Sequence, residues 1–80
     1  MSTTTVVEFT IEPFIEGEPG RHVTAAIAAV EALGLSVDVG PFGSSFETMA
    51  SAVGDAVKAL LDAAYSNGAT HVNVHVEPRS

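Results

Sequence analysis

Apolar and polar residues alternate strictly in several short segments of the chain. In residues 5–12, Val7, Phe9 and Ile11 fall on one side, and residues 70–77 alternate in the same way. A repeat of two residues is typical of a β-strand with one buried face. Shorter alternating segments at residues 35–39 and 44–48 flank the turn-forming segment Gly40–Gly43. The pattern therefore predicts four strands, the second and third forming a hairpin.

Two longer segments have the spacing of amphipathic helices. Over residues 22–33, Val23, Ile27 and Val30 follow an i, i+4, i+7 pattern, with Ala26 and Leu33 widening the apolar stripe. Over residues 49–66 the predicted inner side is again apolar, comprising Val53, Val57, Leu60, Leu61 and Ala64. Thr48 is a plausible N-cap for this second helix, and glycines at positions 34 and 68 are suited to ending the two helices.

The predicted order of elements is βαββαβ, which is the ferredoxin-like arrangement. The fold class expected is α+β, a sandwich with a four-stranded antiparallel sheet of order 4132. A right-handed crossover from strand one to strand two leaves a gap for strand three, and both helices then cover one face of the sheet. At 80 residues the chain is expected to be a single domain, residues 1–80.

This arrangement leaves the other face of the sheet uncovered and polar. Strand geometry alone places on it Glu8, Thr10, Ser36, Asp38, Ser45, Glu47, Asn73 and His75. Such a face is commonly polar simply because it contacts water. However, Glu8 and Glu47 fall on strands expected to be neighbours, where like charges are destabilising. A cationic or amine-bearing ligand would compensate them.

Composition narrows the partners. Ten acidic and three basic residues give a net charge of -7, which disfavours nucleic acid and anionic membranes. There is no cysteine for a disulfide, and 12 Ala and 11 Val dominate the hydrophobic residues. A small domain whose core is built of such small side chains needs additional stabilisation, so we expect a homo-oligomer, a dimer or tetramer.

The N-terminal residues 1–5 lack basic and long apolar segments, and no stretch reaches the ~20 apolar residues of a membrane span. A cytoplasmic protein is expected.

Catalytic and metal motifs are not evident. His71 and His75 are four residues apart, about 13 Å in a strand, too far to share one metal ion. His22, at a helix start, is more typical of a surface or cap-neighbouring residue than of a catalyst. His75 could still meet Glu47 or Glu8 across strands, but these residues have no metal-site spacing motif. The sequence thus predicts no catalytic residue, no metal and no cofactor. Two alternatives stay open: an acid/base enzyme using His75 with Glu8 or Glu47, and a purely structural oligomerisation module.

Three segments resemble the thiamine-binding protein family of small ferredoxin-like domains. They are residues 8–13, EFTIEP, residues 40–47, GPFGSSFE, and residues 74–79, VHVEPR. Family members commonly have Thr in place of Ser44, an aliphatic residue in place of Phe46 and Gly in place of Thr48. The resemblance, which spans nearly the whole chain, implies a cytoplasmic homo-oligomer that binds thiamine or its hydroxymethylpyrimidine half. Glu47 is the residue it most directly implies as a ligand contact.

The candidate site residues suit this ligand class. A carboxylate can form two parallel, charge-assisted hydrogen bonds with a protonated aminopyrimidine, and an aromatic ring can stack on a thiazolium cation. Phe42 in the turn is freer to do so than Phe46, which strand parity directs into the core. The predicted binding residues are Glu47, Ser45, Ser44, Phe42, Glu8, Thr10, Asn73 and His75. Storage, delivery and sensing are all compatible with such a site.

Overall fold

The protein, described by a computed structural model that covers residues 3–15, 17, 20–41 and 43–79, contains one antiparallel sheet and two α-helices. The elements are β1 (Thr4–Glu12), α1 (Arg21–Glu31), β2 (Asp38–Gly40), β3 (Gly43–Met49), a 3-10 turn η1 (Ala50–Ala52), α2 (Val53–Ser66) and β4 (His71–Pro78). The strand order is β2-β3-β1-β4, which is the predicted order 4132. The predicted ferredoxin-like fold is confirmed.

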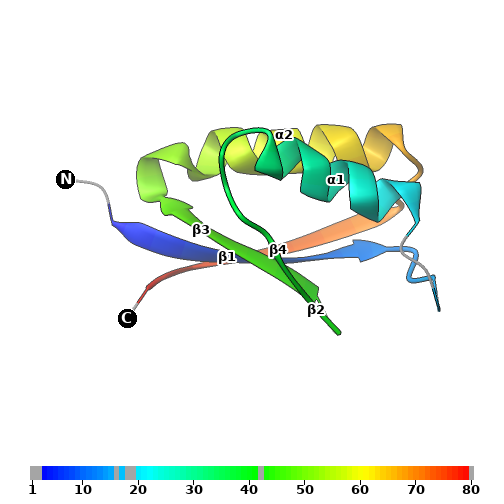
Figure 1. Ribbon diagram of the computed structural model, residues 1–80, viewed down its shortest axis with the longest axis horizontal. Helices are drawn as coiled ribbons and strands as arrows, with labels where there is room; N and C mark the ends of the chain where they lie inside the picture. Colours follow the sequence, from blue (N-terminus) through cyan, green and yellow to red (C-terminus); the bar gives the residue numbers. More distant parts are fainter. Residues whose placement is uncertain (1–2, 16, 18–19, 42, 80) are drawn as a thin grey trace.

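Both helices lie on one side of the sheet, and the core fills the space between these two layers (Figure 1). The first strand contributes Val7, Phe9 and Ile11 to this core, as its alternation predicts. The helices contribute mostly alanine, and the largest completely buried side chains are Leu60, Val7 and Val30. The core is therefore built mainly of small side chains, as the composition indicates.

The register of the strands arranges the open face in rows across the sheet. Glu8 of β1 lies between Ser45 of β3 and His75 of β4, and Asp38 of β2 continues this row beyond Ser45. One row further along, Val6 lies between Glu47 and Glu77. In the opposite direction Thr10 pairs with Asn73. Paired residues of an antiparallel sheet point to the same side, so these rows define the neighbours of each polar side chain.

The beginning of the second helix differs from the prediction. Thr48 is not its N-cap but a residue of β3, where its carbonyl oxygen accepts a hydrogen bond of 2.8 Å from the Thr5 hydroxyl. Pairing of β3 with β1 continues to Met49, and the 3-10 turn then separates this strand from α2. Cross-strand pairing, which depends on a distant segment, thus prevailed over a local capping preference.

The segment after the first helix also differs. Helix α1 ends at Glu31, and Leu33, predicted to widen its apolar stripe, lies in the following turn and is 51% exposed. Gly34 has a φ of 88°, the left-handed conformation predicted for it. The chain then runs without regular structure to β2, which is only three residues long and begins at Asp38 rather than at residue 35.

His22, the second residue of α1, is buried. It is therefore not the surface residue that the sequence suggested, although it does lie next to the helix N-cap, the other position considered for it. Its side chain is 4% exposed, and Nε2 lies 2.7 Å from the Pro13 carbonyl oxygen. A carbonyl oxygen only accepts hydrogen bonds, so Nε2 donates this one. The absent side chain of Gly20 makes room, because a Cβ there would lie 2.5 Å from His22 Cε1. His22 therefore ties the first turn of α1 to the residue that follows β1.

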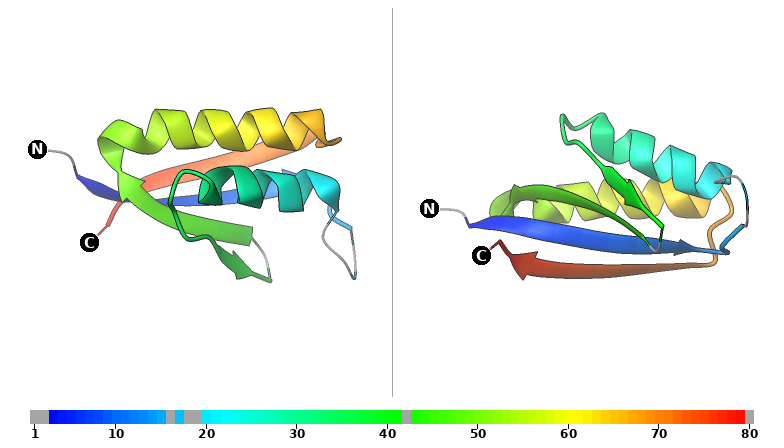
Figure 2. Two further views of the ribbon diagram at one scale, coloured as in Figure 1. Left: turned by 45° about the horizontal axis from the view of Figure 1, so that its top comes forward. Right: turned by 60° about the horizontal axis from the view of Figure 1, so that its bottom comes forward.

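Strands β2 and β4 form the two edges of the sheet (Figure 2). On β4, Val74 and Val76 point to the helix side but are 36% and 44% exposed. Edge position explains this difference from the predicted burial, because a side chain there has a strand on one side only. Among the described helices, none is both long and apolar enough to cross a membrane.

Candidate functional site

A hollow of ≈ 720 Å³ lies on the open face of the sheet and beside the β2–β3 hairpin. The central rows of the face supply its polar lining, and the hairpin supplies a wall that includes Val39, Gly40 and Pro41. Most of the predicted binding residues are brought together here: Glu8, Thr10, Ser44, Ser45, Asn73 and His75. Of the remaining two, Phe42 is outside the described residues and Glu47 is outside the lining. Ligand pockets commonly measure 300 to 1,000 Å³, so this hollow has the size of a small-molecule site.

The two glycines of the hairpin explain why the face is hollowed at this point. Gly40 pairs with Gly43, and neither places a side chain over the row that contains Thr10. A Cβ on Gly43 would lie 3.1 Å from Thr10 Cγ2 and 3.2 Å from the Phe9 carbonyl oxygen. Sequence reasoning missed both glycines as site residues because it interpreted them only as turn formers. It placed Asp38 on the open face but did not include it among the binding residues, although Asp38 also lines the hollow.

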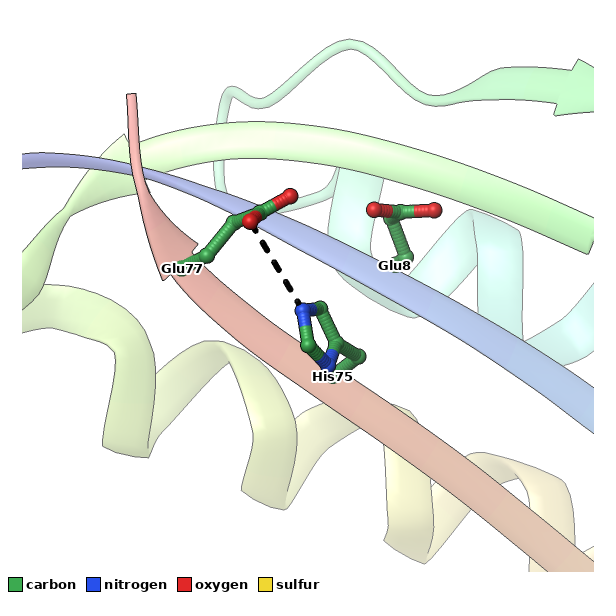
Figure 3. Close-up of side chains that lie close together, drawn as sticks. All are labelled: Glu8, His75 and Glu77. Atoms are coloured by element: carbon green, nitrogen blue, oxygen red, sulfur yellow. Dashed lines mark ion pairs between the residues drawn. The ribbon is translucent and has the colours of Figure 1, made fainter. Parts of the chain in front are cut away.

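Glu8 is the carboxylate at the centre of the hollow's polar lining. The register places it directly beside His75, and Glu77 lies two residues beyond His75 on the same strand and the same face. Figure 3 shows the three side chains on one side of β1 and β4. One donor atom from each lies within 4.8 Å of the others, and His75 Nε2 is 3.8 Å from a Glu77 carboxylate oxygen. All three residues are exposed.

Glu47 is in a different environment. Its carboxylate oxygen Oε1 lies 3.4 Å from Arg79 Nη1, and its register partner on β1 is Val6. The expected juxtaposition with Glu8 is therefore diagonal rather than direct, and Arg79 already compensates the charge of Glu47. Glu47 is not among the residues that line the hollow. Glu8 and Glu47 thus lie on neighbouring strands, as the sequence predicts, but one row apart.

The basic side chains are placed away from Glu8 or are otherwise engaged. Arg79 pairs with Glu47, and Lys58 on α2 pairs with Asp62 at 2.7 Å. The hydrogen bond and the negative charge of Asp62 raise the pKa of Lys58 above its ordinary value. Arg21 is the first residue of α1. Over the described part of the chain no lysine or arginine forms an ion pair with Glu8. Within the described residues, the hollow's central carboxylate therefore has no lysine or arginine as an ion-pair partner.

A second hollow, of ≈ 590 Å³, lies at the β1–α1 loop and shares the hairpin wall with the first. Its lining is largely apolar, with Phe14, Ile15 and Val39 among the contributing residues. Phe14 is 80% exposed and Val39 is 68% exposed. The hairpin therefore separates a polar hollow from an apolar one.

Solved structures with the same fold come from several organisms. A domain of unknown function from Bacillus cereus matches with a TM-score of 0.70 and 22% identity, covering 99% of this chain and 77% of that one. A candidate thiamine biosynthesis/salvage protein from Thermotoga maritima matches with a TM-score of 0.67 and 21% identity, covering 96% of this chain and 84% of that one. At these identities the likeness shows the fold. No curated protein is similar enough to count as a relative.

A comparison with protein families is more specific. The family described as thiamine-binding protein matches residues 7–78, a span that includes every strand but the start of β1 and all the residues of the polar hollow. This match extends over far more than half of the 80 residues. The chain therefore belongs to the thiamine-binding protein family.

Proposed function

We propose that the protein binds thiamine, or its hydroxymethylpyrimidine moiety, in the polar hollow on the open face of the sheet, without transforming it chemically. The observation that carries this proposal is the position of Glu8, a carboxylate in a ligand-sized hollow that has no lysine or arginine paired with it. Membership of the thiamine-binding family supports the choice of ligand.

The row through Glu8 offers the groups that an aminopyrimidine requires. The carboxylate accepts hydrogen bonds from the exocyclic amine and from a protonated ring nitrogen, an arrangement that gives two parallel charge-assisted bonds. Ser45 and His75 flank Glu8, and Thr10 and Asn73 lie in the next row. These hydroxyl, imidazole and amide groups can each donate or accept, so they can orient the remaining polar atoms of the ring.

The charge of the hollow also suits intact thiamine. Its thiazolium ring is permanently cationic, and Asp38 and Glu8 both line the hollow. Each carboxylate that gains a nearby positive charge is stabilised, most strongly where water is excluded. A diphosphate group would instead meet these acidic residues, so free thiamine should bind more tightly than thiamine diphosphate.

The family resemblance and the geometry favour different carboxylates, and paired variants distinguish them. We expect Glu8→Gln to weaken thiamine binding by about 1.5 to 3 kcal/mol, roughly 10- to 150-fold, because one charge-assisted interaction is lost. Glu47→Gln is the matched control, since it makes the same chemical change on the same face at a carboxylate already paired with Arg79. We expect this control to change affinity by less than about threefold, the range of a weak surface pair.

Isothermal titration calorimetry with thiamine, hydroxymethylpyrimidine and thiamine diphosphate measures these effects. If Glu47→Gln alone lost affinity, the binding site would instead lie at Glu47, the residue that the family resemblance implies most directly. Equal binding by both variants and the wild type would contradict the involvement of either carboxylate. Tighter binding of the diphosphate than of thiamine would contradict the acidic site.

The acid/base enzyme is the second candidate, because the register places His75 directly beside Glu8. The same pair that could hold a pyrimidine could also transfer a proton. Incubating the protein with each of the three ligands and quantifying it by chromatography distinguishes the two functions. Full recovery of the ligand supports binding alone, whereas turnover that is abolished by His75→Gln would establish an enzyme.

We also propose that the binding form is a cytoplasmic homo-oligomer, a dimer or tetramer. The proposal is supported by a core of mainly small side chains and by two exposed apolar side chains on the edge strand β4, Val74 and Val76. A second copy could pair with this edge and cover them. Light scattering at micromolar concentration should therefore give a mass well above 8.2 kDa, and a purely monomeric species would contradict the proposal.

A further inference from the structure

Three potential metal ligands converge at the boundary between β1 and β4. Strand pairing sets Glu8 opposite His75, and the two-residue repeat of β4 puts Glu77 on the same face as His75. Their donor atoms lie within 4.8 Å of one another (Figure 3). Because Glu8 and His75 are fixed by direct pairing of two long strands, the backbone already holds these ligands in position.

The donor set is mixed, and its chemistry suits a transition metal. Two carboxylates and one imidazole are oxygen and nitrogen ligands of the kind that bind Zn²⁺ at about 2.0 to 2.2 Å. Donors that share a tetrahedral ion at this distance are about 3.4 Å apart. His75 Nε2 and the nearer Glu77 oxygen are 3.8 Å apart, and these side chains are 67% and 54% exposed. Small rotations of free side chains would complete the geometry.

The charge of the cluster also favours a cation. With His75 neutral, as metal coordination requires, the two carboxylates carry two negative charges side by side. The lysine and arginine side chains that form ion pairs do so elsewhere, Arg79 with Glu47 and Lys58 with Asp62. A divalent ion would neutralise both carboxylates at once, which a protonated histidine cannot do.

We propose that Glu8, His75 and Glu77 form a binding site for a divalent transition-metal ion. This proposal revises the expectation of no metal. That expectation weighed His75 with Glu8 or Glu47, found no spacing motif for a metal site, and did not combine His75 with Glu77. Three protein ligands leave a coordination position open, as in zinc sites that bind water or substrate. Glu8 and His75 also line the polar hollow, so the open position lies at its margin.

Calorimetric titration with ZnCl₂ tests the site directly, using protein freed of any histidine tag. One ion should bind per chain, and His75→Gln and Glu77→Gln should each weaken binding by at least about tenfold, the lower range for disturbing a metal's ligand environment. His71→Gln is the matched control, because it removes an exposed histidine from the same strand outside the cluster. We expect it to change affinity by less than about twofold.

Cobalt provides an independent readout of geometry. Visible absorption bands of bound Co²⁺ should appear in the wild type and in His71→Gln but be lost in His75→Gln. Circular dichroism at the same time establishes that each variant is folded. Absence of Zn²⁺ binding at millimolar concentration, or equal loss in His71→Gln and His75→Gln, would overturn the proposal. These titrations contain no thiamine, so their outcome is independent of the proposed function.

Discussion

Glu8 and Glu47 are the same residue type on the same face of the same sheet, yet their surroundings differ. Glu47 lies beside Arg79, at 3.4 Å, and outside the hollow. Glu8 lies one row away in the hollow, with a histidine and a second carboxylate as neighbours and no lysine or arginine paired with it. Among the described residues, Glu47 has a basic partner and Glu8 has none.

This difference identifies where an external cation gains most. A ligand that approaches Glu47 must compete with a guanidinium that is part of the chain. At Glu8, among the described residues, it meets no lysine or arginine pair and competes with water and the neighbouring His75. The position of the basic residues therefore indicates the binding site as much as the position of the acidic ones.

The largest effect is expected when Glu8 is given an arginine partner like the one that Glu47 has. Ser45 lies directly opposite Glu8, so Ser45→Arg should place a guanidinium beside this carboxylate. We expect thiamine affinity to fall by about 1.5 to 3 kcal/mol, because the interaction between Glu8 and the ligand is replaced. Ser45→Gln, which also introduces a longer polar side chain but an uncharged one, is the control, and it should bind more tightly than Ser45→Arg in calorimetry. Equal affinities would show that bulk, not charge, decides binding.

A second test changes the shape of the hollow and leaves its charge intact. Gly43→Ala would bring a methyl group within 3.1 Å of Thr10 Cγ2, so the strands must shift slightly or the hollow must narrow. We expect a loss of about 1 kcal/mol in both binding and stability, the lower range for overpacking. The matched control is Gly54→Ala in α2, where a Cβ meets nothing within 4 Å. It should raise stability by about 0.5 to 1 kcal/mol and leave affinity unchanged.

The smallest expected effect concerns stability without ligand. Substitution of Glu8 and substitution of Glu47 should change the free energy of unfolding in opposite directions. Glu8→Gln relieves repulsion between neighbouring carboxylates, so the free energy of unfolding should rise by a few tenths of a kcal/mol. Glu47→Gln removes the partner of Arg79 and should lower it by about 0 to 1 kcal/mol. Urea titration of both variants at low ionic strength measures the difference, which salt should reduce. A loss of stability in Glu8→Gln would instead identify Glu8 as a structural residue.

Strand parity together with the helical periodicity predicted the fold and most of the open face, although Ser36, also placed on that face, precedes β2. It placed Val7, Phe9 and Ile11 in the core and most of the hollow's polar residues opposite them. It could not predict which residues share a row, because the register depends on where the hairpin turns and where pairing ends. The one-row offset between Glu8 and Glu47 and the direct pairing of Glu8 with His75 both follow from that register. Local capping likewise gave the wrong beginning for α2, because a distant strand determined it.

The wall of the hollow is the least firmly held part of the sheet. Strand β2 has three residues, all exposed, and it pairs with β3 alone. Such a segment can detach by local unfolding without disturbing the buried core on the other strands. Its amide protons should therefore exchange with solvent faster than those of β1. A ligand that contacts this wall should order it, so part of the binding energy would be used for that ordering and occupancy should be visible as protection of these amide protons from exchange.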